Sequence, residues 1–357
     1  MEFIQNKNPY TLQFALIPPR YVGRAALAEE IVRDLVKDVP TFRCHFISGV
    51  RGSGKTVLMT DVSRRMEAQK DWISVDIANP ESDIVESLAR ALYKKTELKS
   101  LFLNAKIDLS VLGLGISVEK SDTVAVDVED AADIMLSALK KKGKKVLVTI
   151  DEVTYCQGIA AFSHIMSNYA RKGYDIYVLM TGLPENIREI KNNKSLTFLY
   201  RAKDNELKPL NKAGIVNDYS ATFGITADIA NEMAELTKGY AFAFQALGYL
   251  YWKALSENEK ALPKDILGEF DYYLSEFSYE KIWSKATNKE KDILVAMAEK
   301  GGEAVNTELR DMCGMNASAF SVYRDRLIRK GLVNGEKRGY LSFTLPRFCE
   351  YINNIWQ

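Results

Sequence analysis

The sequence has few of the residues that most often bind transition metals or form cross-links. Its 357 residues include two histidines, His45 and His164, and four cysteines that lie far apart without a C-x-x-C pair. Isolated histidines argue against a zinc site or a histidine-based catalytic triad. Scattered cysteines of this kind are typical of reduced thiols in an intracellular protein.

Long apolar runs and a strong charge of one sign are also absent from the sequence. No apolar stretch reaches the roughly 18 residues that a membrane-spanning helix needs. Residues 1–10 lack the basic region and apolar core of a signal peptide, so we expect a cytoplasmic protein with no membrane partner. The net charge of +1 argues against a wholly basic nucleic-acid-binding protein. The length predicts two or three domains.

The chain is organised around residues 49–56, whose sequence GVRGSGKT matches the phosphate-loop pattern G-x-x-x-x-G-K-[ST] at every specified position. A predicted strand at 43–48 precedes this P-loop, and a predicted helix at 57–66 follows it. The glycines let backbone N–H groups point at phosphate oxygens, and the helix N-terminus adds positive potential. These flanks disfavour the alternative of a glycine turn into a core helix. The sequence therefore predicts ATP binding.

Several residues in and near the P-loop have expected roles. Lys55 should bind the β- and γ-phosphates, and the Thr56 hydroxyl should bind Mg²⁺. Arg24, which follows Gly23 at the start of a predicted helix, is either a solvated surface charge or a border of the adenine pocket. The predicted nucleotide-binding residues are Arg24, Gly49, Val50, Arg51, Gly52, Ser53, Gly54, Lys55, Thr56 and Val57.

A second motif completes the predicted catalytic site. An apolar strand at 146–150 ends in Asp151 and Glu152. After a P-loop, this arrangement predicts that Asp151 holds Mg²⁺ and that Glu152 polarises the attacking water as general base. The next strand, at 176–180, ends at Thr181, on the sheet edge where doubly wound folds bind ligands. Thr181 is a candidate sensor of the γ-phosphate, and the alternative is a hydroxyl that caps the strand end.

The remaining segments are described by their predicted secondary structure. Residues 105–120 alternate before Gly113 and predict an inserted β-hairpin. A short strand is expected at 207–210, and residues 211–284 are helical in pattern. Residues 285–357 read as helix, helix, turn, helix and a two-stranded wing, which is the winged form of the helix-turn-helix.

Positive charge gathers on the third helix and the wing of this last segment. Residues 316–347 hold seven basic and two acidic residues, the footprint of a protein that contacts the phosphates of double-stranded DNA. The alternative is a winged helix used for protein contacts or for packing. The predicted DNA-binding residues are Ser318, Ser321, Arg324, Arg329, Lys337 and Arg338.

With these residues located, the chain resembles AAA+ ATPases of the origin-recognition and archaeal-ATPase-like group. It is more closely similar to bacterial stand-alone AAA family ATPases with a C-terminal winged helix. The resemblance rests on PPRYVGR at 18–24, SGVRGSGKTVL at 48–58, VTIDEV at 148–153, VLMTGLPENI at 178–187 and YRDRLIRKGLV at 323–333. It implies an α/β fold with a parallel five-stranded sheet in the order 5-1-4-3-2, an α-helical lid and a winged helix.

The resemblance also implies domain boundaries and partners. We expect an N-terminal arm and first helix at 1–40, a nucleotide-binding core at 41–210, a lid at 211–284 and the winged helix at 285–357. Arg201 lies in the stretch where related proteins place basic residues that can act as an arginine finger for a neighbouring subunit, which implies a homo-oligomer or a nucleotide-dependent assembly. The alternative for Arg201 is an intramolecular salt bridge.

One departure from the resemblance bears on function. Phe242 stands where origin-type ATPases place the lid arginine that contacts the γ-phosphate. Two expectations follow: hydrolysis of ATP to ADP is slow, or the lid responds to nucleotide through packing alone. Two classes of function remain: an ATPase whose nucleotide state controls DNA binding, and an assembly switch whose winged helix contacts protein. A small-molecule kinase would need an acceptor pocket that the sequence does not indicate.

Overall fold

The computed structural model describes residues 7–13, 15–78, 81, 83–104, 107–108, 110–112 and 123–356. The chain forms two compact units. The sheet unit comprises Ala26–Ser48 and Leu58–Glu206. The lid–wing unit comprises Met1–Ala25, Gly49–Val57 and Leu207–Gln357, so the P-loop groups with the C-terminal helices. The domain boundaries expected from the sequence remain a prediction.

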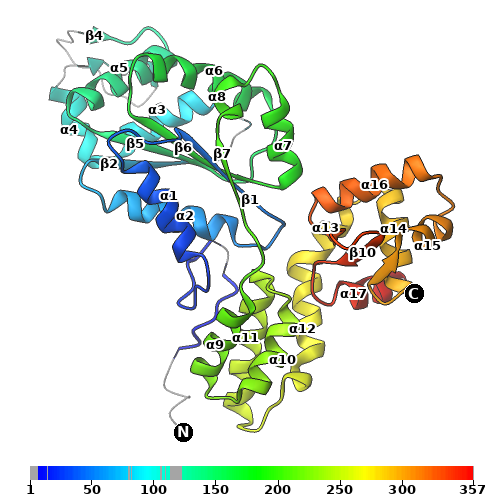
Figure 1. Ribbon diagram of the computed structural model, residues 1–357. Helices are drawn as coiled ribbons and strands as arrows, with labels where there is room; N and C mark the ends of the chain where they lie inside the picture. Colours follow the sequence, from blue (N-terminus) through cyan, green and yellow to red (C-terminus); the bar gives the residue numbers. More distant parts are fainter. Residues whose placement is uncertain are drawn as a thin grey trace. The chain divides into compact units, whose positions relative to one another are not determined.

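The sheet unit is built on five parallel strands in the order β2-β5-β6-β1-β7 (Figure 1). This order confirms the predicted 5-1-4-3-2 topology. Four of the strands are apolar and almost wholly buried, as expected when helices cover both faces of a parallel sheet. The strands are Cys44–Ser48 (β1), Trp72–Ile77 (β2), Lys145–Ile150 (β5), Ile176–Gly182 (β6) and Lys203–Glu206 (β7).

Helices pack on both faces of this sheet. Figure 1 shows α1 and α2 on one side and α3, α5 and α6 on the other. Alternate strand residues such as Phe46, Val148 and Val178 belong to one apolar core with residues of α3, α5 and α6. The helices are Ala25–Leu35 (α1), Lys55–Glu67 (α2), Ile84–Lys94 (α3), Thr96–Asn104 (α4), Val128–Lys141 (α5), Gln157–Arg171 (α6), Pro184–Asn192 (α7) and Thr197–Tyr200 (α8).

The last strand of the sheet differs from the one that the sequence predicts. The last strand of the sheet is β7, not 207–210, because Pro209 cannot donate to a ladder and β7 instead pairs with β1. In β7 the Asn205 side chain is buried and donates to the Phe46 carbonyl at 2.9 Å.

The predicted hairpin at 105–120 lies mostly outside the described residues. Its described parts are Ile107–Asp108 (β3), which pairs in parallel with Thr123–Val124 (β4), and a 3₁₀ turn.

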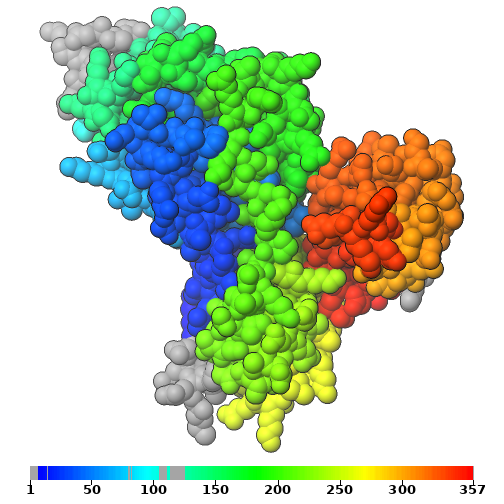
Figure 2. All heavy atoms as spheres, in the orientation of Figure 1, coloured from blue at the N-terminus to red at the C-terminus, as the bar shows by residue number. Residues whose placement is uncertain are grey.

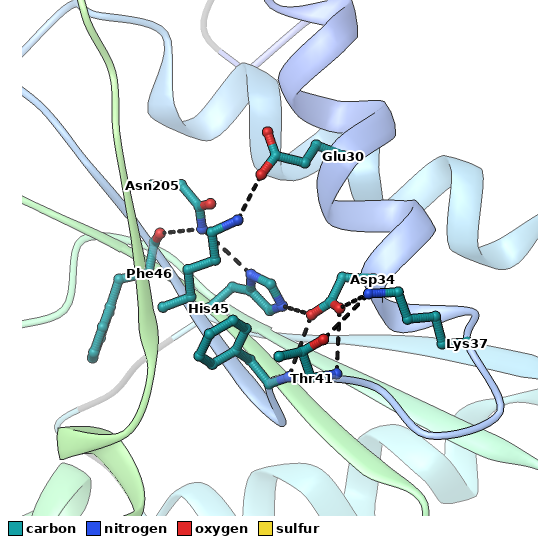
Figure 3. Close-up of polar contacts among 9 residues, drawn as sticks. Glu30, Asp34, Lys37, Thr41, His45, Phe46 and Asn205 are labelled. Carbon is teal, nitrogen blue, oxygen red and sulfur yellow. Dashed lines mark hydrogen bonds and ion pairs between the residues drawn. The ribbon is translucent and has the colours of Figure 1, made fainter.

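The strand that leads into the P-loop carries a buried histidine (Figure 3). His45 is 1% exposed, and its Nε2 lies 3.3 Å from Asp34 Oδ2 without the alignment of a hydrogen bond. Its Nδ1 lies 3.4 Å from the Asn205 side-chain nitrogen. Burial lowers the pKa of His45 to about 4, although Asp34 acts in the opposite direction. Burial raises the pKa of Asp34, but hydrogen bonds from Lys37 and Thr41 outweigh it and hold the pKa at about 2.

We expect acid to destabilise the sheet unit through His45. Because its pKa is lower in the folded than in the unfolded protein, the unfolded chain binds more protons between pH 6.5 and about 4. The free energy of unfolding should fall by about 2 kcal/mol on going from pH 7 to pH 5. Asp34 contributes only at lower pH, between its ordinary value of 3.8 and about 2. Urea titrations at both pH values should show a weaker pH dependence for His45→Gln, whereas His164→Gln, on an exposed residue, should match the wild type. An unchanged dependence in His45→Gln would refute this assignment.

The lid–wing unit is mainly helical. Its first part contains Lys212–Phe223 (α9), Ala227–Thr237 (α10), Ala241–Glu257 (α11), a 3₁₀ turn at Pro263–Ile266, Leu267–Leu274 (α12), a π-helical turn at Ser275–Tyr279 and Glu280–Ser284 (α13). Its second part contains Asn288–Glu299 (α14), Asn306–Met312 (α15), Ala317–Arg329 (α16) and Phe348–Trp356 (α17). One apolar core joins residues of both parts. Among the described helices, none combines the length and apolarity that crossing a membrane requires.

The wing has one strand more than the sequence predicts. Glu303–Val305 (β8), Tyr340–Phe343 (β10) and Val333–Asn334 (β9) form an antiparallel sheet in the order β8-β10-β9. The sequence predicted only the two-stranded wing. β8 is three residues long and follows a Gly301–Gly302 turn, so it lacks a periodic pattern of its own. Pairing with β10 creates it.

Candidate functional site

The P-loop joins the end of β1 at Ser48 to the start of α2 at Lys55. Two of its glycines have left-handed backbone conformations, with φ of 74° at Gly52 and 91° at Gly54. Other residues adopt these conformations only with strain. The Ser53 N–H donates to the Val50 carbonyl at 3.2 Å, which closes the turn. The loop therefore has the curled backbone that phosphate binding requires.

Lys55 is held inside this curl. Its side chain is 7% exposed, and Nζ lies 3.0 Å from the carbonyl oxygens of both Gly49 and Val50. The ammonium is thus fixed at the first turn of α2, where the helix N-terminus also favours an anion. A buried cation and a helix N-terminus at one place suit phosphate.

Two buried polar atoms near the P-loop have no hydrogen-bond partner among the described residues. They are Arg24 Nε and Ser53 Oγ. Arg24 is 8% exposed and its Nη2 donates to the Ser53 carbonyl at 3.2 Å, so the alternative of a solvated surface charge is wrong. Burial lowers the pKa of Arg24. Buried donors without partners cost about 1–3 kcal/mol each, and an anionic ligand such as a nucleotide supplies acceptors for them.

In the sheet unit, three neighbouring strands end at one edge of the sheet. β1 pairs with β6, and β6 pairs with β5, all in parallel. In this register Ile47 lies opposite Thr181, and Ile150 lies opposite Met180. Gly49 follows β1 directly in the chain and Asp151 follows β5. The topology therefore brings the ends of the predicted site's strands to one edge.

Thr181 ties the two acidic residues of this edge together. Its side chain is fully buried and its hydroxyl donates to Asp151. The Glu152 N–H donates to the Thr181 hydroxyl at 3.0 Å, and it lies 3.1 Å from Asp151 Oδ1. These contacts agree with a hydroxyl that caps the strand ends, and a sensing role for Thr181 stays a proposal.

Glu152 has an unusual backbone conformation. Its φ is 51°, in the left-handed region that residues other than glycine seldom adopt, and the residue is exposed. Strain of this kind persists where the surrounding structure imposes it, and it is frequent at functional sites. Here the hydrogen bonds of its N–H hold the conformation.

The described residues contain no group of three histidine, cysteine or acidic side chains that could hold a metal ion. A magnesium site does not require one, because Mg²⁺ keeps several waters and binds to one or two protein ligands plus phosphate oxygens. The predicted ligands Thr56 and Asp151 suit that chemistry. They do not suit zinc.

Arg201 is exposed at the C-terminal end of α8. It makes no ion pair with any residue that the structure describes. The described residues therefore offer no support for the alternative that Arg201 forms an intramolecular salt bridge. The preceding Tyr200 is 66% exposed, so the two side chains are available to another molecule.

The predicted DNA-contacting residues lie on α16 and the wing, in the orange to red region of Figure 2. Five of the six are exposed, and Arg324 is partly buried and paired with Asp325 at 3.1 Å. The exposed five are Ser318, Ser321, Arg329, Lys337 and Arg338. In α16 Phe320 and Leu327 are buried, so the helix presents one apolar and one polar face.

Part of the positive charge of this segment is neutralised from outside it. Lys330 lies 2.8 Å from Glu290, which is 1% exposed, and Arg347 pairs with Asp271 on α12. Sequence reasoning missed both pairs because their acids lie far away in the chain. Lys337 also pairs with an acid outside the segment, Glu303, and Arg324 pairs with the neighbouring Asp325. Of the seven basic residues of 316–347, Arg326, Arg329 and Arg338 make no ion pair with any residue that the structure describes.

Sequence reasoning also missed Tyr240, which lies against the P-loop. Its hydroxyl donates to the Arg51 carbonyl at 2.7 Å. Phe242, in the place of the lid arginine, donates its backbone N–H to the Gly52 carbonyl at 3.1 Å. Its ring lies 6.4 Å from those of Tyr240 and Phe277, centroid to centroid. The lid thus contacts the loop through backbone and aromatic groups.

Comparisons with known proteins bear on the fold. A family model described as a domain of unknown function, DUF8462, matches residues 277–352. No curated protein matches the sequence.

Several solved structures are similar to the whole chain. The Aeropyrum pernix ORC2 protein in ADPNP–ADP complexes has a TM-score of 0.63 and 13% identity, with 98% of each chain covered. The ADP form of ORC2 has a TM-score of 0.53 and 14% identity, with 96% of each chain covered. Cdc6p from Pyrobaculum aerophilum has a TM-score of 0.51 and 15% identity, also with 96% of each covered. The chain therefore has the α/β AAA+ fold of ORC and Cdc6 proteins, as the resemblance implied.

Proposed function

We propose that this protein binds ATP at the P-loop, hydrolyses it slowly with Mg²⁺, and uses its nucleotide state to control a winged-helix DNA-binding domain. The observation that carries nucleotide binding is the pair of buried atoms without partners, Arg24 Nε and Ser53 Oγ, beside a loop with two left-handed glycines. An anionic ligand would satisfy both atoms. The ADPNP–ADP and ADP complexes of ORC2, which shares this fold, agree with this ligand.

In this proposal each residue of the site has one role. Lys55 binds the β- and γ-phosphates, and Glu152 accepts a proton from the attacking water. Thr56 and Asp151 would hold Mg²⁺, which when bound offsets the negative charge of the phosphate oxygens. Thr181 orients both acids through the hydrogen bonds described above and senses the γ-phosphate. Arg201, exposed and without an ion pair among the described residues, would serve the site of a neighbouring subunit.

The DNA-binding part of the proposal rests on charge and shape. α16 presents exposed serine and arginine side chains, and the wing tip presents Lys337 and Arg338. Lys337 lies 2.7 Å from Glu303, but its side chain is 65% exposed, and an exposed pair of this kind is weak. It can therefore exchange this partner for a phosphate.

The second candidate function is an assembly switch in which the winged helix binds protein. It is favoured by two observations. Phe242 supplies no cation to the γ-phosphate, and Gly331 of the winged helix packs against Val50 of the P-loop, where an added Cβ would lie 2.4 Å from the Val50 side chain. In this reading ATP is held rather than turned over.

Replacing both Lys337 and Arg338 with alanine should distinguish the two functions. Each lost phosphate contact should reduce the slope of log affinity against log salt by about 0.9, and the loss should be similar for all DNA sequences. Electrophoretic shift assays over a salt series, with ATP and with ADP, measure both quantities. Alanine at Lys260 and Lys264, two exposed lid lysines, is the matched control and should change neither.

A different outcome would exclude the DNA-linked reading. Phosphate contacts are strongest at low salt. If the dissociation constant of the wild type for duplex DNA is about millimolar or weaker there, with ATP and with ADP, the winged helix does not bind DNA. The switch function then remains.

A further inference from the structure

The start of α11 holds the P-loop through two successive carbonyl groups. The Tyr240 hydroxyl binds the Arg51 carbonyl and the Phe242 N–H binds the Gly52 carbonyl. A Cβ added to Gly52 would lie 2.0 Å from the Tyr240 hydroxyl oxygen, so only glycine fits there. Each peptide is planar, so these carbonyls fix the N–H groups of Gly52 and Ser53 as well. A phosphate that binds the Gly52 N–H must therefore act on the Tyr240 contact, because that N–H and the Arg51 carbonyl belong to one peptide.

Tyr240 also contacts a second residue of the lid, Ser278. Its hydroxyl lies 2.6 Å from the Ser278 hydroxyl. The Arg51 carbonyl can only accept and Tyr240 has one proton, so Tyr240 donates to Arg51 and Ser278 donates to Tyr240. Tyr240 is 5% and Ser278 is 1% exposed, which leaves little room for water to replace either bond. Burial raises the pKa of Tyr240, which keeps its proton in place.

Ser278 belongs to the π-helical turn Ser275–Tyr279, which also holds the winged helix. The next residue, Tyr279, is fully buried and its hydroxyl donates to the Pro346 carbonyl. Its ring lies 5.0 Å from that of Phe348, centroid to centroid, at the start of α17. Turns of this kind are frequent at functional sites. Adjacent residues of one turn therefore contact the P-loop partner and the winged helix.

We propose that Tyr240 and Ser278 are positioning residues that couple the conformation of the P-loop to the winged helix. The inference rests on the proposed function, because it takes the P-loop ligand to be a nucleotide. A ligand that turns the peptide between Arg51 and Gly52 changes the Tyr240 bond, and Ser278 transmits the change to the π-helical turn. The packing of Val50 against Gly331 gives the loop a second contact with the same domain. This coupling needs no lid arginine.

Hydrogen–deuterium exchange with and without ATP tests the coupling in the full chain. In the wild type we expect ATP to change exchange rates in residues 331–347 by roughly fivefold or more, the lower end of coupling between sites. In Tyr240→Phe and Ser278→Ala this change should be lost, while ATP affinity falls by only about fivefold, as for one hydrogen bond. Tyr219→Phe is the matched control. Its hydroxyl is buried and donates to the Phe244 carbonyl on α11, away from the P-loop.

The possible outcomes separate the two proposals. A response that persists in Tyr240→Phe or in Ser278→Ala with ATP bound overturns the inference, and so does an equal loss in Tyr219→Phe. A wild type that binds ATP without any response in 331–347 also overturns it and leaves the proposed nucleotide binding standing. A wild type that binds no nucleotide in calorimetry refutes the proposed function, and the inference falls with it.

Discussion

Replacing Lys55 with alanine should lower the affinity for ATP by roughly 10- to 140-fold, since a hydrogen bond to a charged group contributes roughly 1.5–3 kcal/mol and 1.4 kcal/mol is tenfold. The fold should remain, because the Lys55 ammonium donates to the Gly49 and Val50 carbonyls of the loop itself, and the glycine turn of that loop does not depend on the lysine. Isothermal titration with ATP gives the affinity, and circular dichroism establishes that the variant is folded.

Lys191→Ala provides the matched control for this experiment. Lys191 also donates to a backbone carbonyl, that of Ala202 at 2.9 Å, but it lies outside the P-loop. Its replacement should leave ATP affinity unchanged. Equal ATP binding by the wild type and a folded Lys55→Ala variant would contradict the assignment of residues 49–56 as the phosphate site.

Replacing Glu152 with glutamine should preserve ATP binding and reduce turnover by about 10²–10⁴-fold, the usual contribution of a general base. The amide fills the same space, but it cannot accept the proton of the attacking water. The backbone should keep its left-handed conformation, because the Glu152 N–H, which the substitution does not change, donates to Asp151 and Thr181. Phosphate release with and without DNA measures the effect.

Two comparisons make this result specific. Glu189→Gln, on an exposed residue of α7, should turn over ATP as the wild type does. Mixing Glu152→Gln with Arg201→Ala should restore some activity if Arg201 acts on a neighbouring subunit, because hybrid interfaces pair an intact glutamate with an intact arginine. Equal turnover by Glu152→Gln and the wild type would show that Glu152 is misassigned. A wild type without measurable phosphate release would favour the assembly switch.

The parts of the fold that could be predicted are those whose signal is local. The apolar runs of β1, β5 and β6 are long enough to read as buried strands, and the P-loop pattern is contiguous. β7 was misplaced because its sequence, KDNE, has no apolar alternation and becomes a strand only by pairing with β1. β8 was missed for the same reason, since among the described strands it pairs with β10 alone.

The burial and pairing of individual side chains were decided by tertiary structure. His45 reads in the sequence as an isolated histidine, yet it lies beside Asp34 and Asn205 inside the sheet unit. Lys330 and Arg347 read as part of a basic surface, yet each is paired with an acid outside its segment. Such contacts depend on which elements pack together, and no spacing within one segment encodes them.

By itself the sequence determined the P-loop pattern with Lys55 and Thr56 and the two acids that follow the apolar strand at 146–150, because each is read from residues that are neighbours in the chain. The order of the strands came from the resemblance, since β1 pairs with β6 and β7, which lie far away in the chain. The tertiary structure alone decided that Arg24 is buried against Ser53 and that Tyr240 binds Arg51. The two residues of each pair are 29 and 189 positions apart. A hydrogen bond requires its atoms to lie within about 3.2 Å in a suitable direction, and only the packed chain establishes that.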